Sequence, residues 1–236
     1  MKSTTEILDN TEIVPKTCRE CGESFILAFP SLAPFVDVCP NCSEHHAIVD
    51  ARQALAEAER ARNDRWERLC PLEFRDTKLE RLPVPNATKR VLAWQYGPRG
   101  LILHGPTGTG KSRSSWLLLR REFKAGRRIV VMDYSAGIEY ARQYSESTRT
   151  ADNWVCARME CDLLFMDDVL KARLSDGFEA ALFAIVAERT ENGRPIIATT
   201  NDTGTSLEAR MTDDRGAALV RRLREHCDSV TFTKGR

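Results

Sequence analysis

The sequence predicts an α/β fold in which a parallel five-stranded sheet is covered by helices, with a small metal-stabilised domain ahead of it. Three observations lead to this prediction. A short apolar run feeds directly into a glycine-rich phosphate-binding pattern, four further apolar runs follow with helical segments between them, and two C-x-x-C pairs lie near the N-terminus. Apolar runs that alternate with helices are typical of a parallel sheet buried on both faces.

The cysteine pairs come first along the chain. Cys18 and Cys21 form one pair and Cys39 and Cys42 the other, with seventeen residues between them. Each pair can direct two thiolates at one metal from a tight turn, which predicts a tetrahedral zinc site and a zinc-ribbon-like domain over residues 1–46. The segment between the pairs has too few apolar residues for a core of its own, so the metal would supply stability. A redox pair is the alternative, but no thioredoxin-like βαβ pattern surrounds either motif.

A polar helix is predicted next. Ala47 to Cys70 is rich in Ala, Glu and Arg and lacks Gly and Pro, which favours a helical linker over residues 47–70. The nucleotide-binding domain is then expected over residues 71–236. Phe74 and Leu82 lie on its proline-rich first segment, where they can grip a bound base or belong to the core.

The phosphate-binding pattern follows a strand predicted from Gly100 to Leu103. Its glycines let the backbone curl so that successive N–H groups point at phosphates. Lys111 supplies a positive charge, and the Ser112 hydroxyl can bind Mg²⁺. Arg113 to Phe123 has helical spacing, so the loop opens onto a helix N-terminus, which favours an anion. The pattern that binds ATP consists of Gly105, Pro106, Thr107, Gly108, Thr109, Gly110, Lys111 and Ser112.

Polar side chains follow the later strands. Parallel strands gather ligands at their carboxyl ends, and a buried run from Leu163 to Met166 ends in two aspartates there. Asp167 is predicted to hold Mg²⁺ through water and Ser112, while Asp168 orients or deprotonates the attacking water. Asn201 ends the next strand, where its amide can hydrogen-bond the γ-phosphate or the water. The four later strands are predicted over Arg128–Asp133, Asp162–Asp168, Pro195–Asn201 and Ser229–Thr233.

Residues 71–236, about 70 per cent of the chain, resemble the AAA+ ATPases of the DnaC/DnaI helicase-loader group and the related IstB transposition helpers. The resemblance implies that Arg222 acts as an arginine finger, with Arg221 and Arg224 beside it, and that Asn201 is the first sensor. It also implies a P-loop fold of the AAA+ type without the C-terminal lid found in most AAA+ ATPases. It is carried by the stretches GPTGTGKS, DLLFMDD, RPIIATTN and RGAALVRRLREHCDSVTF.

The resemblance and the N-terminal cysteines together predict an ATP-dependent replication protein. We expect a helicase loader that docks on a replicative helicase through its zinc-binding half, engages single-stranded DNA and works as a homo-oligomer with ATP, Mg²⁺ and Zn²⁺. Three rivals stay open: an IstB-like transposition helper acting on duplex DNA, a zinc-ribbon adaptor that uses ATP as a binding switch, and a DNA-packaging or repair ATPase of another branch. The candidates for DNA contact, which can equally pack between helices, are Tyr140, Arg142, Tyr144, Arg149 and Trp154.

Charge and hydropathy indicate which kinds of partner and which cellular location to expect. Lys and Arg total 35 against 34 Asp and Glu, a net charge of +1 that does not point to nucleic acid by itself. Residues 1–69 hold 8 basic and 12 acidic residues, which favours a protein partner over a phosphate backbone for this part. The start lacks a signal-peptide core, and no run reaches the roughly 20 apolar residues of a membrane span. We therefore expect a cytoplasmic protein without a membrane partner.

Overall fold

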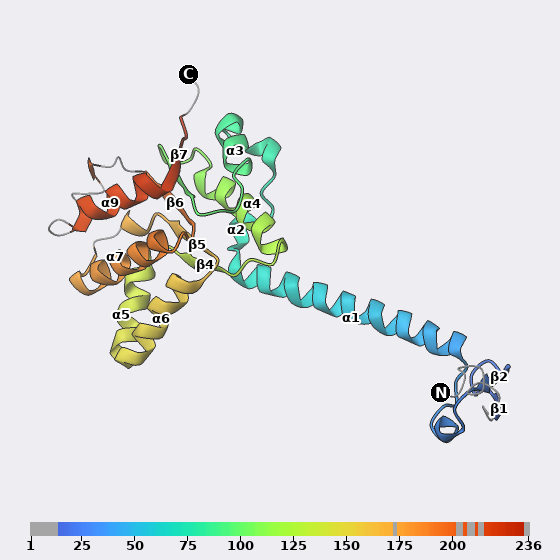
Figure 1. Cartoon of the computed structure of the whole chain (residues 1–236). Coiled ribbons are helices and arrows are strands. Elements are labelled where there is room, and N and C mark those ends of the chain that lie inside the picture. The colour runs from blue at the N-terminus through green and yellow to red at the C-terminus, as the bar shows by residue number, and fades with distance from the viewer. Residues whose placement is uncertain (1–13, 172–173, 202–204, 207–210, 212–214, 234–236) are drawn as a thin grey trace, which may run out of the picture. The chain divides into compact units, whose positions relative to one another are not determined.

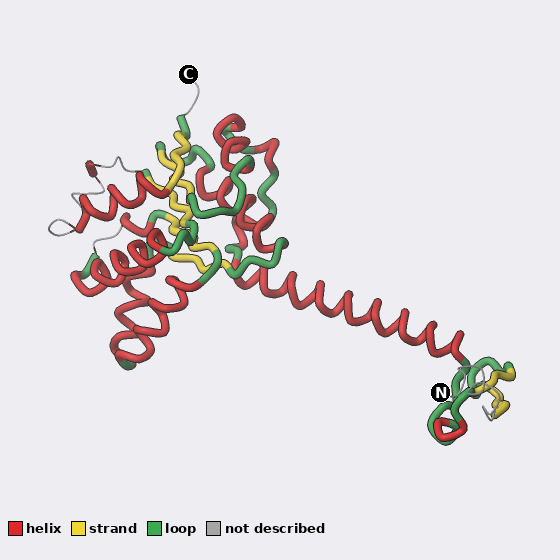
Figure 2. The backbone as a smooth tube through the Cα atoms, in the orientation of Figure 1, coloured by secondary structure: helices red, strands yellow, loops and turns green. Residues whose placement is uncertain are grey.

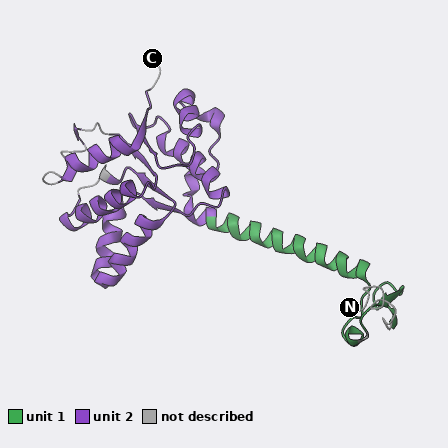
Figure 3. Ribbon diagram, viewed as in Figure 1, with its two compact units in different colours: residues 1–65 green, residues 66–236 purple. Residues whose placement is uncertain are grey.

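The computed structural model of the chain describes residues 14–171, 174–201, 205–206, 211 and 215–233. The chain forms two compact units, Met1–Arg65 and Trp66–Arg236, which Figure 3 distinguishes by colour. Each unit is described by itself below. The domain boundaries expected after residues 46 and 70 stay predictions.

The first unit contains a small hairpin and most of a long helix. Strands β1 (Val14–Thr17) and β2 (Ser24–Leu27) pair antiparallel, and a 3₁₀ turn, η2 (Pro30–Leu32), follows. Helix α1 (Pro40–Leu69) confirms the predicted polar helix but begins earlier than expected. It begins at Pro40 because proline is well suited to the first helical position, where no backbone donor is needed.

The second unit is built on the predicted parallel sheet. Its five strands lie in the order β4-β5-β6-β3-β7, and every neighbouring pair is parallel. The observed bounds differ from the predicted ones by at most two residues. The strands are β3 (Gly100–His104), β4 (Ile129–Met132), β5 (Leu163–Asp167), β6 (Ile196–Thr200) and β7 (Cys227–Thr231).

Helices cover both faces of this sheet, as Figures 1 and 2 show. Helices α3 and α4 lie on one face, and α5, α6, α7 and α9 lie on the other. The α/β fold with a covered five-stranded parallel sheet is therefore confirmed. The helical segments are α2 (Leu72–Arg75), η3 (Leu79–Arg81), α3 (Pro85–Leu92), α4 (Lys111–Lys124), α5 (Ala136–Glu146), α6 (Thr148–Glu160), η4 (Val169–Lys171), α7 (Asp176–Glu191) and α9 (Arg215–His226).

The two faces of the sheet form separate apolar cores. Along β5, Leu163 and Phe165 pack in the cluster with α4, whereas Leu164 and Met166 pack in the cluster with α7 and α9. This division follows from the alternation of side chains along a strand. The same alternation directs the next side chain, Asp167, to the face on which α4 lies.

A buried arginine ties the amino ends of the strands together. Arg189 on α7 has no exposed surface, and its guanidinium donates to the carbonyls of Arg158, Cys161 and Pro195 at 2.8, 2.9 and 2.8 Å. Arg158 lies in the last turn of α6, where helix carbonyls lack intrahelical partners. Arg189 therefore caps α6 and joins it to the segments that lead into β5 and β6.

Candidate nucleotide-binding site

The phosphate loop joins β3 to α4, as the sequence predicts. Gly105 has a φ of +143°, and a Cβ at this position would lie 2.1 Å from the carbonyl oxygen of Phe232, so a side chain has no room. Gly108 has a φ of +78°, a conformation that glycine adopts without strain. Helix α4 begins at Lys111, so the loop ends at a helix N-terminus whose free N–H groups favour an anion.

Lys111 is folded into this loop and is only 6% exposed. Its ammonium donates to the carbonyl oxygens of Gly105 (2.7 Å) and Pro106 (3.0 Å) and to Oδ1 of Asn201 (2.7 Å). Burial lowers the pKa of Lys111, and the charges of Asp168 and Asp167 oppose that shift. A buried cation among neutral acceptors gains from a nearby anion, so these residues fit the phosphates of a nucleotide.

Ser112 and Asp167 meet as predicted. The Ser112 hydroxyl donates to Oδ1 of Asp167 at 2.7 Å. The pair is brought together because α4 starts beside the carboxyl end of β5 on the face to which Asp167 points. Hydroxyl and carboxylate oxygens are ligands that Mg²⁺ accepts alongside phosphate oxygens, so the two residues fit this metal.

Asn201 connects Lys111 to Asp168. Its Nδ2 donates to Oδ2 of Asp168 at 2.9 Å, while its Oδ1 accepts from Lys111. Asp168 has a φ of +51°, which aspartate tolerates better than most residues. Burial raises the pKa of Asp168, and the charge of Asp167 raises it further, while Lys111 opposes both. A carboxylate with a raised pKa is suited to accepting a proton.

Thr199 is a site residue to which the sequence assigns no role. Its hydroxyl donates to Oδ1 of Asp167 at 2.5 Å and accepts from the backbone N–H of Asp168 at 3.2 Å. The signal in the sequence is the register of two adjacent parallel strands, since Asp167 and Thr199 are paired across β5 and β6. That pairing is known only once the strand order is known.

Arg222 lies on α9 against α7. Its guanidinium forms an ion pair with Glu191 at 3.1 Å and lies over the ring of Phe183, 5.8 Å from its centroid. The side chain is half-buried, whereas Arg221 and Arg224 are exposed. The face of the sheet that α9 covers is opposite the face that α4 covers, so Arg222 and the start of α4 lie on different faces.

One of the proposed DNA-contacting aromatics, Trp154, is a core residue, and the partly buried Tyr140 packs against the same core. Trp154 is 6% exposed, and its ring packs against Tyr140 and Phe178 at centroid distances of 5.5 and 6.2 Å. The interpretation of Trp154 as a stacking face is therefore wrong, because helices α5, α6 and α7 enclose it. Tyr144 is 59% exposed.

Phe74 and Leu82 both serve packing. The Phe74 ring stacks on Trp116 with centroids 5.9 Å apart, within the core on the α4 face. Leu82 is buried, and it and Pro83 lie against Gly110, whose Cβ position would be 3.2 Å from Cδ of Pro83. The segment before α3 thus borders the phosphate loop.

The four N-terminal cysteines converge. Their sulfur atoms all lie within 4.8 Å of one another, and Cys21 and Cys39 are 3.7 Å apart. A tetrahedral zinc with four thiolates separates its sulfurs by about 3.8 Å, so the cluster fits this metal. Backbone N–H groups of Cys21 and Cys39 lower the pKa of Cys18 to about 6, whereas the neighbouring thiols of Cys39 and Cys21 raise the pKa of Cys42.

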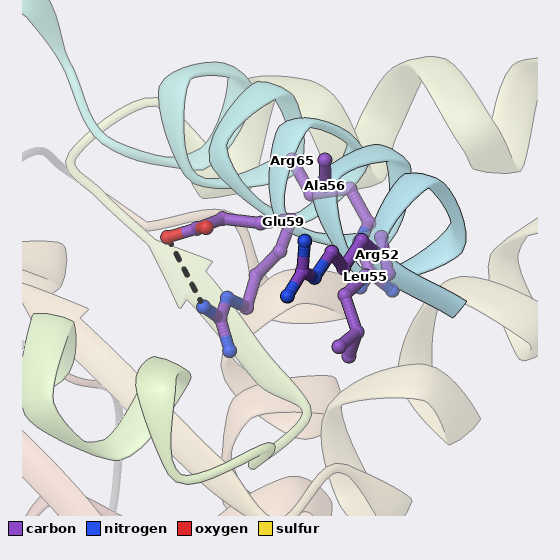
Figure 4. Close-up of a pocket in the computed structure, with 7 residues that line it drawn as sticks. Arg52, Leu55, Ala56, Glu59 and Arg65 are labelled. Atoms are coloured by element: carbon purple, nitrogen blue, oxygen red, sulfur yellow. Dashed lines mark ion pairs between the residues drawn. The ribbon is translucent and has the colours of Figure 1, made fainter. Parts of the chain in front are cut away.

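A depression on α1, drawn in Figure 4, has a different character. It lies on one helix, and its side chains are exposed apart from the half-buried Arg62. Sites for small molecules are instead concave, with a few converging polar groups. The residues around it are Arg52, Leu55, Ala56, Ala58, Glu59, Arg62 and Arg65.

Comparison with known proteins identifies the family. The model of the family described as IstB-like ATP binding protein matches residues 42–235. The chain belongs to the IstB-like ATP-binding protein family. The resemblance to DnaC- and IstB-type AAA+ ATPases is thereby confirmed. No curated protein sequence matches this IstB-like chain.

Solved structures agree on the fold of this IstB-like protein. DnaI superposes with a TM-score of 0.56 at 17% identity over 72% of this chain and 98% of DnaI. The DnaC helicase loader superposes with a TM-score of 0.54 at 18% identity, over 72% of this chain and 99% of DnaC. The replication initiator DnaA, bound to AMPPCP and single-stranded DNA, superposes with a TM-score of 0.54 at 18% identity. The match covers 70% of this chain and 50% of DnaA.

A second DnaA structure, bound to AMPPCP and from Aquifex aeolicus, gives a TM-score of 0.51 at 17% identity. The IstB-like chain covers 62% of its own length in that match and 45% of DnaA. It thus spans half or less of the two DnaA chains. Together these similarities show an AAA+ fold of the DnaC/DnaI type. Within the residues that the structure describes, no helix has the length and apolar content needed to cross a bilayer.

Proposed function

We propose that this protein is an ATPase that loads a replicative helicase onto single-stranded DNA in the cytoplasm. The observation that carries the ATPase part is the hydrogen-bonded network in which Lys111, Asn201 and Asp168 meet at the carboxyl edge of the sheet. The network combines a phosphate-binding cation with a carboxylate whose pKa is raised. Such a combination is what hydrolysis of a phosphoanhydride requires.

Each residue has a distinct proposed role. Lys111 and the N–H groups of residues 105–112 bind the phosphates, and Ser112 and Asp167 would hold Mg²⁺. The metal supplies positive charge against the charge that develops on the phosphate oxygens. Asp168 orients the attacking water or accepts its proton, and Asn201 positions the water or the γ-phosphate. A switch that only binds ATP would not need Asp168, so measurable turnover separates the two readings.

The helicase and the DNA are proposed from similarity. One structural neighbour, DnaC, is a helicase loader, and another, DnaA, is bound to single-stranded DNA. We propose that residues 1–46 form the domain that docks on the helicase, residues 47–70 a linker, and residues 71–236 the ATPase domain. The proposal is tested by mixing the full chain with the replicative helicase of the source organism. Co-elution on sizing and helicase transfer onto single-stranded DNA with ATP are expected, and absence of any association would contradict the loader function.

A transposition helper is the second candidate, favoured by the family model, which describes IstB-like proteins. DNA preference separates the two. A loader should prefer single strands, with affinity that falls steeply as salt is raised because phosphate contacts release counterions. Stronger binding of duplex DNA across the same salt range would favour the transposition helper.

We also propose that Arg222 acts in trans in a homo-oligomer. A neighbouring subunit would supply the positive charge on the far side of the γ-phosphate, which is worth roughly 10³ to 10⁵ in rate. Asp168→Asn and Arg222→Ala subunits should each bind ATP and barely hydrolyse it. A mixture should regain part of the activity, since some interfaces pair an intact Asp168 with an intact Arg222. A co-assembled mixture that stays inactive would rule out the finger.

One zinc ion per chain is proposed at the four cysteines. Metal analysis of the purified protein should give one equivalent, and Cys39→Ser should lose it because three thiolates leave the tetrahedron open. Cys156→Ser, at an exposed cysteine outside the cluster, is the matched control and should keep the metal. A full equivalent in Cys39→Ser would exclude the four-thiolate site.

A further inference from the structure

Asp167 carries two hydrogen bonds on the same oxygen. Ser112 donates to Oδ1 from α4, and Thr199 donates to it from β6. The two hydroxyl donors differ in whether they can exchange Asp167 for another partner. The Ser112 hydroxyl is at the start of the phosphate loop helix and is the proposed Mg²⁺ ligand, so its hydrogen bond to Asp167 is exchangeable.

Thr199 has no such freedom. Its side chain is 4% exposed, and it lies between β5 and β3, paired with Asp167 on one side and with Leu103 on the other. A hydroxyl has one proton to donate, and that proton is directed at Asp167 because Asp168 N–H occupies an acceptor position on the same oxygen. The direction of the hydroxyl is therefore fixed from both sides.

The same residue also fixes the backbone of Asp168. The Asp168 N–H reaches both the carbonyl oxygen of Thr199 at 3.3 Å and its hydroxyl at 3.2 Å. Asp168 has a φ of +51°, so its left-handed turn depends on such contacts to persist. One side chain thus sets the orientation of one aspartate and the backbone turn of the next.

We infer that Thr199 is a positioning residue that holds the Asp167 carboxylate in the orientation needed to bind Mg²⁺ with the nucleotide. The inference rests on the proposed Mg²⁺-dependent ATP site. A carboxylate that ligates a metal depends on the hydrogen bonds that orient it, and loss of such a bond typically lowers metal affinity on the order of 10-fold to 100-fold. Thr199 itself contacts neither phosphate nor water in this role.

Thr199→Val tests the inference, because valine keeps the β-branched shape and removes only the hydroxyl. The readout is binding, not turnover. A fluorescent non-hydrolysable ATP analogue is titrated into the full chain at increasing Mg²⁺, and the Mg²⁺ concentration that gives half the gain in affinity is measured. Thr199→Val should need on the order of 10-fold to 100-fold more Mg²⁺, while its binding of the analogue in EDTA stays at the wild-type level.

Two matched variants separate positioning from damage to the fold. Thr199→Ser restores a hydroxyl and should return the Mg²⁺ requirement toward wild type. Thr200→Val makes the same change one residue along the strand, where the side chain points to the opposite face, and should leave the requirement unchanged.

Each failure has its own signature. If the wild-type protein binds the analogue equally well with and without Mg²⁺, the proposed Mg²⁺ site is wrong and the inference falls with it. If wild-type binding depends on Mg²⁺ and Thr199→Val has the same dependence, the proposed site stands and the role of Thr199 is overturned. Loss of analogue binding in EDTA by Thr199→Val, without rescue by Thr199→Ser, would also overturn it in favour of a structural role.

Discussion

Lys111 and Arg189 are buried cations at opposite ends of the same sheet, and both donate to backbone carbonyls. Arg189 is enclosed at the amino ends of the strands, where its acceptors come from α6 and from the segments before β5 and β6. Lys111 lies at the carboxyl ends, where its acceptors come from its own loop and from Asn201. Burial lowers the pKa of both side chains.

What surrounds the two cations differs. The acceptors of Arg189 are neutral backbone carbonyls at the end of α6 and before β5 and β6, and its role is to complete a helix end. Lys111 has the carboxylates of Asp167 and Asp168 nearby and belongs to a loop whose glycines leave the backbone open to an anion. Burial and carbonyl contacts alone therefore do not mark a functional cation. The nearby carboxylates and the phosphate loop do.

The largest effect is expected from Arg189→Met. The substitution removes the guanidinium from the carbonyls of Arg158 and Cys161 and from that of Pro195, which keeps the Leu164 N–H at 3.4 Å. An unsatisfied buried acceptor costs about 1–3 kcal/mol, so the free energy of unfolding should fall by about 2 kcal/mol or more. Urea unfolding measures it. Arg194→Met is the control, since the Arg194 guanidinium makes one hydrogen bond to Met159 at 2.8 Å. Equal urea midpoints for Arg189→Met and Arg194→Met would contradict the structural role given to Arg189.

Lys111→Ala should weaken ATP binding strongly and change the free energy of unfolding little. Two charge-assisted hydrogen bonds to phosphate are worth about 1.5–3 kcal/mol each, so ATP affinity should fall by roughly 100-fold or more. Stability should change little, because the carbonyls of Gly105 and Pro106 belong to a loop at the edge of the sheet. Equilibrium dialysis with ATP and a urea midpoint on the same sample give both values. ATP binding at wild-type affinity would contradict the assignment of the phosphate loop.

The smallest expected effect is a shift in pH dependence. Because burial and Asp167 raise the pKa of Asp168, protonation should abolish hydrolysis at a higher pH than an ordinary aspartate, whose pKa is 3.8, would give. The hydrogen bond from Asn201 lowers this pKa, so Asn201→Ala should move the acidic limb of kcat/KM to still higher pH. An acidic limb that stays in place in Asn201→Ala would show that Asn201 does not set the titration of Asp168.

Much of the site is predictable because its motif is local. The phosphate loop has a fixed spacing, so Lys111 and Ser112 follow from the sequence, and Asp167 follows from the end of an apolar strand. Thr199 and Arg189 do not follow from it. Most of their partners lie about 30 residues away and many are backbone groups, which no residue pattern encodes. The strands themselves are predictable since their apolar runs are continuous.

The environments of Arg222 and Trp154 could not be predicted from the sequence of their own helices. A basic run at the end of a helix looks exposed in the sequence, yet Arg222 is paired with Glu191 on the neighbouring helix. An aromatic residue near arginines resembles a nucleic-acid contact, yet the Arg158 guanidinium lies 3.4 Å from the centroid of the buried Trp154 ring. Which face of each helix is covered depends on tertiary packing, which single-helix patterns do not determine.

The carbonyl of Phe232 lies against Gly105, and β3 is placed between β6 and β7. The strand that leads into the phosphate loop therefore has both of its sheet neighbours in later parts of the sequence. On the ribosome, β3 and the glycine loop emerge long before either neighbour, and they cannot reach their final arrangement until residues near 232 have been translated. Nucleotide capture during synthesis would thus be delayed until nearly the whole sheet can assemble, and a nascent chain halted after α7 should not retain ATP.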